Sequence, residues 1–344
     1  MSSHHGALVS RLAALLTLGA LTLAAASLRA AGPPPSPVHL KVLFVRFLSF
    51  APLAIAEAEG YFRSQGLEVE PVTLTGSNEA TPPLIRGELD VVTGLIKIGD
   101  FNAIARGASL RLVADKGHFE AGPCAPMAFV ARPGLMDGEG ANEPARLRRA
   151  RVAASPLSYV EYALETLLSR KGLKLTDVNL ARMHEGMVGE AIEKGSLDIG
   201  VLAEPNLSRA VKSGKAVLWA PFPEFLPEGQ LAAIYFGPGL LERNRDAGRR
   251  FMVAYLQGVR QYNRGKTPRN LDILVSATGL DRELLKEACW QPIRGDGRIN
   301  VESVLDFQRW AVRRGALDAV VPAERFWDPS FVEEATRVLG PPKP

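Results

Sequence analysis

Apolar and polar stretches alternate along the chain in the order of repeated strand, loop and helix units. The apolar run Lys41–Val45 has the length of a buried strand, and Ser49–Pro52 interrupts the pattern. Leu53–Arg63 is then typical of a helix, which Gly66 ends. A strand followed by a short loop and a helix is the first half of a βαβ unit. Ligands in open α/β folds lie at the carboxyl ends of such strands, beside helix N-termini.

The alternation continues from Lys41 to Trp219 and occurs twice, and the chain of 344 residues is long enough for about two domains on a prior of roughly 150 residues per domain. Each half has the order βαβαβαβ, which predicts a mainly parallel sheet covered by helices. The further strands expected are Glu68–Leu74, Val91–Leu95, Leu110–Ala114, Arg151–Ala154, Val178–Ala181, Ile199–Leu202 and Ala216–Trp219, and the helices between them end near Arg86, Arg106, Arg170, Lys194 and Ser213.

Three glycines of the first half have counterparts in the second half at a nearly constant distance along the chain. The separation is the same to within two positions for all three pairs, which indicates a duplicated architecture. The alternative is that any two α/β halves look alike at this level of detail. The pairs are Gly66 with Gly172, Gly87 with Gly195 in the shared pattern Gly-x-Leu-Asp, and Gly107 with Gly214.

Two apolar segments ending in Pro-Gly are interpreted as crossings between the two lobes. They lie in Ala125–Arg132 and Leu231–Phe236. Helical patterns follow the second segment, with apolar residues of Asn244–Arg264 close to 3.6 spacing, and these helices are expected to pack on the first lobe. We therefore expect lobe 1 at 38–125 and 237–344, lobe 2 at 133–225, and crossings at 126–132 and 226–236.

The N-terminal region differs from the rest of the chain. Arg11 precedes the apolar run Leu12–Ala26, and small residues continue through Ala31. This pattern predicts a cleaved secretory signal over residues 1–30. An uncleaved membrane anchor is the alternative, although the run is shorter than the ~20 apolar residues of a membrane span.

Composition excludes several classes of function. Apolar residues make up 47% and charged residues 23%, as in ordinary globular proteins. No basic block occurs beyond Arg146–Arg151, so nucleic acid is not an expected partner. Cys124 and Cys289 are too few for a cysteine-rich metal or redox site. In an exported chain they either form one disulfide or remain two buried thiols.

The sequence contains no recognisable catalytic constellation. His39, His118 and His184 lie outside the predicted signal, and their spacing does not match a metal site. His184 precedes Glu185, which we interpret as a chance pairing. We therefore predict no catalytic residue, no metal and no cofactor.

The loops at the predicted carboxyl ends of strands hold the candidate ligand-binding residues. Serine and asparagine supply hydrogen-bond donors, aromatic and Met side chains supply apolar contacts, and Glu204 could accept from an amine or a ring N–H. The alternative for many of these residues is a role as a helix cap or in the core. The candidates are Phe47, Ser49, Phe50, Ser77, Asn78, Leu95, Ile96, Ser155, Ser158, Tyr159, Glu185, Met187 and Glu204.

Several ordered blocks of this sequence resemble the periplasmic substrate-binding proteins of ABC importers. The blocks include LSFAPLAIAEAEGYFRSQGLEVE, GELDVVTG, AIARGASLRLVAD, EAIEKGSLDIGVLAEP and DPSFVEEATRVLG, and the resemblance spans about Val38 to Gly340. The most similar group is the NMT1/THI5-like, or SsuA/TauA/NrtA-like, set for sulfonates, taurine, nitrate and pyrimidine precursors.

The resemblance implies a type II periplasmic binding protein fold, with two lobes, two hinge crossings and a small-molecule ligand between them. It further implies a monomer in the periplasm that delivers its ligand to an ABC transporter permease. An enzyme such as a pyrimidine-precursor synthase is the alternative, but the cysteine-rich iron site of that branch has no match here. On this basis we expect Phe50→Ala and Tyr159→Ala to weaken ligand binding while leaving the fold intact.

Overall fold

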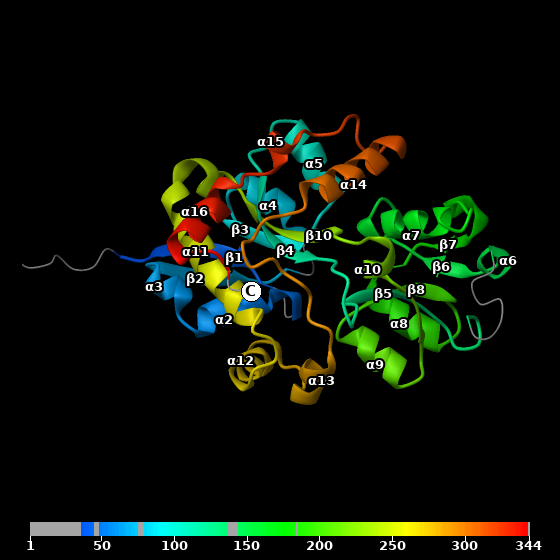
Figure 1. The fold of residues 1–344 in the computed structure, drawn as a ribbon. Helices are drawn as coiled ribbons and strands as arrows, with labels where there is room; N and C mark the ends of the chain where they lie inside the picture. Colours follow the sequence, from blue (N-terminus) through cyan, green and yellow to red (C-terminus); the bar gives the residue numbers. More distant parts are fainter. Residues whose placement is uncertain (1–35, 45–47, 75–78, 137–143, 184, 343–344) are drawn as a thin grey trace, which may run out of the picture. The chain divides into compact units, whose positions relative to one another are not determined.

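The computed structural model describes residues 36–44, 48–74, 79–136, 144–183 and 185–342 (Figure 1). The predicted signal, residues 1–30, therefore lies outside the described residues. From Pro37 onward the chain belongs to one compact unit. Within it, the strands form two separate five-stranded sheets. No helix among the described residues has both the length and the apolar character needed to cross a membrane.

The first sheet has the strand order β2-β1-β3-β10-β4. β1 runs parallel to β2 and β3, whereas β10 runs antiparallel to its neighbours β3 and β4. The sheet is therefore mixed, because a strand that returns from the second sheet inserts between two strands of the first. Its strands are β1 Val38–Leu43, β2 Leu67–Val72, β3 Val91–Leu95, β4 Arg111–His118 and β10 Gln230–Phe236.

The second sheet repeats this topology, with the order β7-β6-β8-β5-β9. β6 is parallel to β7 and β8, and β5 is the antiparallel strand inserted between β8 and β9. In each sheet, the inserted strand is thus the first one after the chain arrives from the other sheet. Its strands are β5 Met127–Ala131, β6 Arg151–Ala153, β7 Asn179–Ala181, β8 Ile199–Ala203 and β9 Val217–Pro221.

The chain passes between the sheets twice. It leaves β4 at His118 and starts β5 at Met127, and later it leaves β9 at Pro221 and starts β10 at Gln230. The segments interpreted from the sequence as crossings contain β5 and β10, so the passages between the sheets are residues 119–126 and 222–229. Short helix α10, Phe222–Phe225, lies in the second passage.

Helices cover both sheets, as Figure 1 shows. The expected helix Leu53–Arg63 is divided into α2 and α3, because Gly60 between them adopts a left-handed conformation with φ 72°. The helices α5, α7, α8, α9 and α11 lie close to their predicted positions, whereas α6, α10, α15 and α16 were not predicted. The helical elements are η1 Leu48–Phe50, α2 Ala51–Ala58, α3 Tyr61–Ser64, α4 Thr81–Arg86, α5 Ile98–Ala105, α6 Pro144–Leu147, α7 Tyr159–Ser169, η3 Leu175–Asp177, α8 Glu185–Glu193, α9 Asn206–Lys212, η4 Gly239–Arg243, α11 Arg245–Tyr262, α12 Pro268–Thr278, α13 Arg282–Glu287, α14 Val301–Arg313, α15 Ala323–Phe326 and α16 Ser330–Leu339.

The long helix α11 organises the core on the first sheet. It packs against α2 and α16, and the apolar face predicted from its 3.6-residue period, which includes Phe251 and Tyr255, is buried. α11 approaches α2 closely at Gly258, where a Cβ would lie 2.3 Å from the carbonyl oxygen of Pro52. Only glycine fits there without moving one of the two helices.

A disulfide joins Cys124 to Cys289, with 5.7 Å between their Cα atoms. Of the two possibilities that the sequence left open, the structure therefore has the disulfide. It connects the first passage between the sheets to the segment that follows α13.

Candidate functional site

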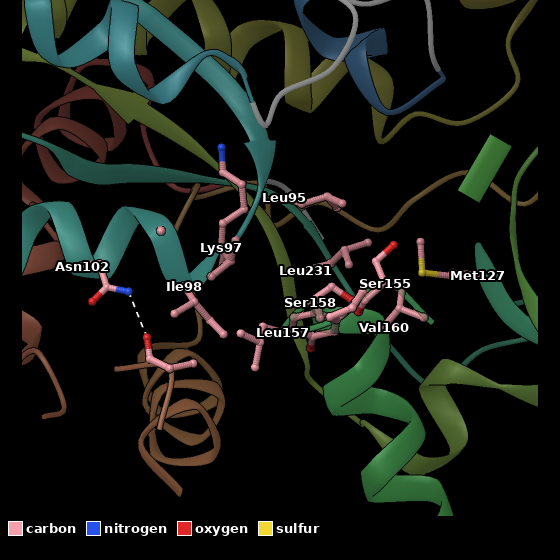
Figure 2. A pocket seen from close by; sticks show the side chains of 15 residues that line it. Leu95, Lys97, Ile98, Asn102, Met127, Ser155, Leu157, Ser158, Val160 and Leu231 are labelled. Carbon is pink, nitrogen blue, oxygen red and sulfur yellow. Dashed lines mark hydrogen bonds between the residues drawn. The ribbon is translucent and has the colours of Figure 1, made fainter. Parts of the chain in front are cut away.

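A cavity of about 490 Å³ is lined by segments from the carboxyl edges of both sheets (Figure 2). Leu95–Gly99 follows β3 of the first sheet, and Ser155–Val160 connects β6 of the second sheet to helix α7. Met127 at the start of β5 and Leu231 in β10 add apolar surface. The cavity thus lies where parallel strands of both sheets end and helices begin, which is the usual ligand edge of an α/β sheet.

The lining of this cavity is mainly apolar, and the hydroxyls of its two serines already bond to the backbone. Ser158 Oγ donates to the carbonyl oxygen of Ser155 at 2.6 Å and accepts from the amide of Glu161 at 3.2 Å, which makes Ser158 the N-cap of α7. Ser155 Oγ donates to the carbonyl oxygen of Met183 at 3.4 Å. Both hydroxyls keep free lone pairs with which they could accept from a ligand.

Leu157 projects from the loop before α7 and is 44% exposed. Its φ of 54° is unusual for a residue other than glycine and costs on the order of 1–3 kcal/mol. The Leu157 amide donates to Glu161 Oε2, so the helix holds this conformation in place. Ile98, the first residue of α5, lines the same cavity. Apolar side chains from the segments that follow β3 and β6 can therefore both contact an apolar ligand body.

Lys97 contributes its alkyl chain to the cavity, while its ammonium group is directed elsewhere (Figure 2). Lys97 Nζ donates to Thr81 Oγ1 at 2.9 Å and lies 3.7 Å from Asp100 Oδ1, and Thr81 Oγ1 donates to that same oxygen at 2.7 Å. Burial lowers the pKa of Lys97 and raises the pKa of Asp100, and in both cases it outweighs their mutual attraction. This group fixes the loop after β3.

A second lysine is buried at the same edge of the first sheet. Lys116 lies two residues before the end of β4, and its Nζ donates to Ser49 Oγ at 3.0 Å. The ammonium also lies 4.1 Å from the centre of the Phe50 ring, a cation–π contact. Burial lowers the pKa of Lys116 to about 7. Lys116 is not among the residues predicted from the sequence, because a lysine that follows Asp115 beyond the predicted strand Leu110–Ala114 is ordinarily solvated.

A buried network next to Lys116 anchors the first passage between the sheets. Asp115, which is fully buried, accepts from Gln230 Nε2 at 2.7 Å and from the amide of Arg294 at 2.8 Å. His118 Nδ1 lies 2.8 Å from the second carboxylate oxygen of Asp115. These contacts join β4, β10 and the segment before α14, so they fix the ends of both passages.

The structure brings together five of the sequence-predicted residues and separates others. Ser49 and Phe50 in η1 contact Lys116 on β4, and Met187 on α8 is 60% exposed. Phe47, Ser77 and Asn78 lie outside the described residues, as does the side chain of Glu185 at the start of α8. The five that line the cavity together are Leu95, Ile96, Ser155, Ser158 and Tyr159.

Glu204 has protein partners in this structure. Its carboxylate accepts from Ser208 Oγ at 2.7 Å and from the amide of Cys289 at 3.1 Å. It therefore links the end of β8 to the disulfide-bonded segment after α13. A second contact joins the same two regions, since Lys212 at the end of α9 and Glu287 at the end of α13 form an ion pair at 2.6 Å.

The two aromatic candidates that the structure describes, Phe50 and Tyr159, are 4% exposed and pack in the core. Phe50 packs edge-on against Phe44, with ring centres 5.8 Å apart. Tyr159 packs against Phe307 at 5.4 Å and Phe119 at 6.3 Å. Truncating either ring would leave a core void, which in general costs about 3–5 kcal/mol. Alanine substitution at these positions would therefore test stability and binding together.

The family model described as NMT1/THI5 like matches residues 48–263. A search of curated proteins gives no match. Among solved structures, the chain is similar to the ligand-binding component of an ABC-type import system from Staphylococcus aureus, with 16% identity, a TM-score of 0.70, and coverage of 87% of this chain and 99% of that one.

Two further similar structures are periplasmic proteins. The aliphatic sulphonate binding protein SsuA from Escherichia coli has 16% identity, a TM-score of 0.67, and coverage of 86% of this chain and 93% of its own. The nitrate-binding protein NrtA from Synechocystis has 13% identity, a TM-score of 0.70, and coverage of 90% of both chains. These likenesses show that the two sheets form the periplasmic binding protein fold, as the resemblance of the sequence implied.

Proposed function

The chain belongs to the NMT1/THI5-like family, and from this premise we propose that it is the solute-binding subunit of an ABC importer. It works in the periplasm as a monomer, holds a small organic ligand between its two sheets, and delivers it to a membrane permease. Its action is binding and release, with no covalent step. A ligand that touches both sheets favours the closed arrangement over open ones by its differential affinity for the two.

The cavity shared by both sheet edges is the observation that carries this proposal. Its volume of about 490 Å³ falls within the range of roughly 300–1,000 Å³ that is usual for small-molecule sites. One wall comes from the loop after β3 and the other from the loop before α7, so a ligand there contacts both sheets at once. The apolar lining with Ser155 and Ser158 fits a compact molecule that has an apolar body and a polar end.

A thermal-shift panel of small molecules tests the proposal. The panel holds alkanesulfonates, taurine, nitrate, aromatic and aliphatic carboxylates, their amides, and neutral pyrimidines. A ligand at 100 times its Kd stabilises the folded chain by about 2.7 kcal/mol, which raises Tm by several degrees. We expect at least one member to do so and to be recovered chemically unchanged. A panel without any stabilising member, or a ligand converted to product, would contradict the proposal.

Leu157→Glu locates the site, and Leu218→Glu is its matched control. Both leucines are exposed to a similar degree, 44% and 45%, but Leu218 lies on β9 and does not line the cavity. We expect Leu157→Glu to raise Kd for the panel ligand at least tenfold, because it places a charge against an apolar ligand body. The Leu218 variant should bind normally, and equal effects in both variants would argue against this cavity.

A further inference from the structure

We propose that Arg314 and Glu161 are positioning residues for ligand binding, because together they hold Leu157 in the conformation in which it lines the cavity. The turn that follows α14, residues 314–316, thereby becomes a third wall of the cavity, beside the loop after β3 and the loop before α7. This inference rests on the proposed solute-binding function and deepens it, since it names residues outside the lining that determine the affinity of that same site.

Glu161 holds the backbone of Leu157 from within helix α7. In an ordinary capping box, the carboxylate at the third helical position accepts from the amide of the N-cap residue. Ser158 is the N-cap of α7 and Glu161 is its third residue, but Glu161 Oε2 accepts from the amide of Leu157, one residue earlier. A leucine at φ 54° is disfavoured by itself, so this hydrogen bond supports a conformation that the loop alone would rarely adopt.

Arg314 in turn holds the carboxylate of Glu161. Glu161 is only 3% exposed, and its other oxygen, Oε1, accepts from Arg314 Nη2 at 3.0 Å. Removing the charged partner of a buried carboxylate is strongly unfavourable, so without Arg314 the carboxylate would turn toward water or take up a proton. Either change weakens the hydrogen bond that Glu161 accepts from Leu157.

A second contact one helical turn away fixes the register of α7 and α14. Glu165 lies four residues after Glu161 and accepts from the indole Nε1 of Trp310 at 2.8 Å, and Trp310 lies four residues before Arg314. Residues four apart face the same side of a helix. The ring of Phe307, three residues before Trp310, packs against two tyrosine rings near the start of α7. Arg314 therefore reaches Glu161 as part of an aligned pair of helices.

The turn after α14 also contacts the part of the cavity that belongs to the first sheet. Gly315, with φ 67°, follows Arg314 and ends the helix. Asn102 Nδ2 on α5 donates to the carbonyl oxygen of Ala316 at 2.9 Å, and both residues line the cavity (Figure 2). Three consecutive residues thus reach α7 with a side chain and α5 with a carbonyl group. The turn connects the two helices whose N-termini form the cavity.

Loss of Arg314 should weaken ligand binding without removing any group that contacts the ligand. Leu157 would relax to negative φ, and a bound molecule would have to restore the positive φ before it gained the same contacts. This cost of reorganisation lowers affinity. The usual cost of a positive φ at a residue other than glycine corresponds to a rise in Kd of about 5- to 150-fold.

Amide hydrogen exchange in the ligand-free protein tests the positioning directly. At pH 7 we expect Arg314→Met to raise the exchange rate of the Leu157 amide at least tenfold, while the amides of strand β8 keep their rates. Arg309→Met is the matched control and should leave Leu157 unchanged. The Arg309 side chain is 40% exposed against 37% for Arg314, and it pairs with Glu302 and Asp306 of α14 itself.

Calorimetry connects this positioning to binding. The probes are butanesulfonate, benzoate, benzamide and cytosine, together with any member of the thermal-shift panel that stabilises the chain. Arg314→Met should raise Kd at least fivefold for each probe that binds. Leu157→Gly supplies the second arm, because glycine adopts positive φ without steric cost. In that background Arg314→Met should raise Kd less than twofold, a coupling that a general loss of stability would not produce.

The outcomes separate this inference from the proposed function. An unchanged Leu157 exchange rate in Arg314→Met, or an equal rise of Kd in both backgrounds, overturns the positioning role and leaves the binding function standing. Failure of every probe and panel member to bind contradicts the function itself. If Arg314→Met does not fold, Glu161→Gln replaces it, because the amide keeps the shape of the carboxylate and removes its charge. Faster exchange of Leu157 in that variant supports the inference, whereas an unchanged rate overturns it.

Discussion

The two sheets place an aspartate at the same point of the same topology. Asp90 Oδ2 accepts from the amide of Lys41 at 2.9 Å, and the Asp90 amide donates to the Lys41 carbonyl oxygen at 2.9 Å. Asp198 forms the same pair of contacts with Arg151, at 2.8 and 3.0 Å. In both sheets this aspartate therefore closes the turn that leads from a helix into the strand after it.

The halves differ in the chemistry of their ligand edges. The first edge has two lysines, the partly buried Lys97 and the buried Lys116, whereas the second offers the hydroxyls of Ser155 and Ser158 and the apolar Leu157. The two sheets therefore share their backbone topology but differ in the charge and polarity of the residues at their carboxyl edges.

The largest predicted effect concerns the disulfide, which joins the first passage between the sheets to the segment after α13 and has no counterpart at the second passage among the described residues. Cys124 and Cys289 are 165 residues apart, and closing so long a loop restricts the unfolded chain considerably. Replacing both by serine should lower the free energy of unfolding by about 4 kcal/mol. Guanidinium denaturation of the two oxidised proteins measures the difference.

Reduction of the unaltered protein by dithiothreitol should give a similar loss, and the same treatment of the double serine variant should change nothing. A loss below about 1 kcal/mol in the variant would mean that the bond adds little to the contacts around it, such as that between Glu204 and the Cys289 amide.

The paired aspartates predict the next largest effect. Asp198 also binds the Arg151 and Arg132 side chains, with Nε to Oδ1 at 2.6 Å for Arg132, and the Arg151 side chain holds the pKa of Asp198 well below its usual range. Asp198→Ala should therefore cost about 3 kcal/mol, and Asp90→Ala about 1 kcal/mol, measured by denaturation at pH 7.

The contribution of Asp198 to the free energy of unfolding should depend on pH. Because the folded pKa of Asp198 is lowered, its stabilisation is complete above the usual carboxylate pKa and is lost as the pH falls toward the lowered value. The difference between the unaltered protein and Asp198→Asn should accordingly shrink below about pH 4. Equal losses for the two aspartates would show that the arginines add nothing.

The local pattern of apolar runs and glycines in the sequence was sufficient to predict the repeated strand and helix units. β3 has the predicted bounds, Val91–Leu95, and the paired glycines all adopt positive φ, as in Gly87 at 75° and Gly195 at 68°. These features depend on neighbouring residues: apolar runs form buried strands, and glycine ends helices without steric cost. The five cavity-lining candidates were found for a related reason, because strand ends are visible in the sequence.

The remaining features depend on contacts between distant parts of the chain. The antiparallel insertion of β5 and β10 follows from the direction in which the chain enters each sheet, which an apolar run alone does not reveal. The burial of Lys116 depends on Ser49 and Phe50, which are separated from it by two strands in sequence. Glu204, a candidate ligand-binding residue, bonds Ser208 and also the Cys289 amide, a partner 85 positions away that no local pattern reveals.

The smallest predicted effects compare one serine from each edge. Ser158 caps α7, so Ser158→Ala should lower the free energy of unfolding by about 1 kcal/mol. Ser49 caps no helix and instead accepts from Lys116, so Ser49→Ala leaves a buried donor without this partner and should cost at least as much, about 1–3 kcal/mol. Denaturation of both variants at pH 7 compares the two roles. A loss for Ser49→Ala well below that for Ser158→Ala would show that the hydrogen bond to Lys116 adds little to stability.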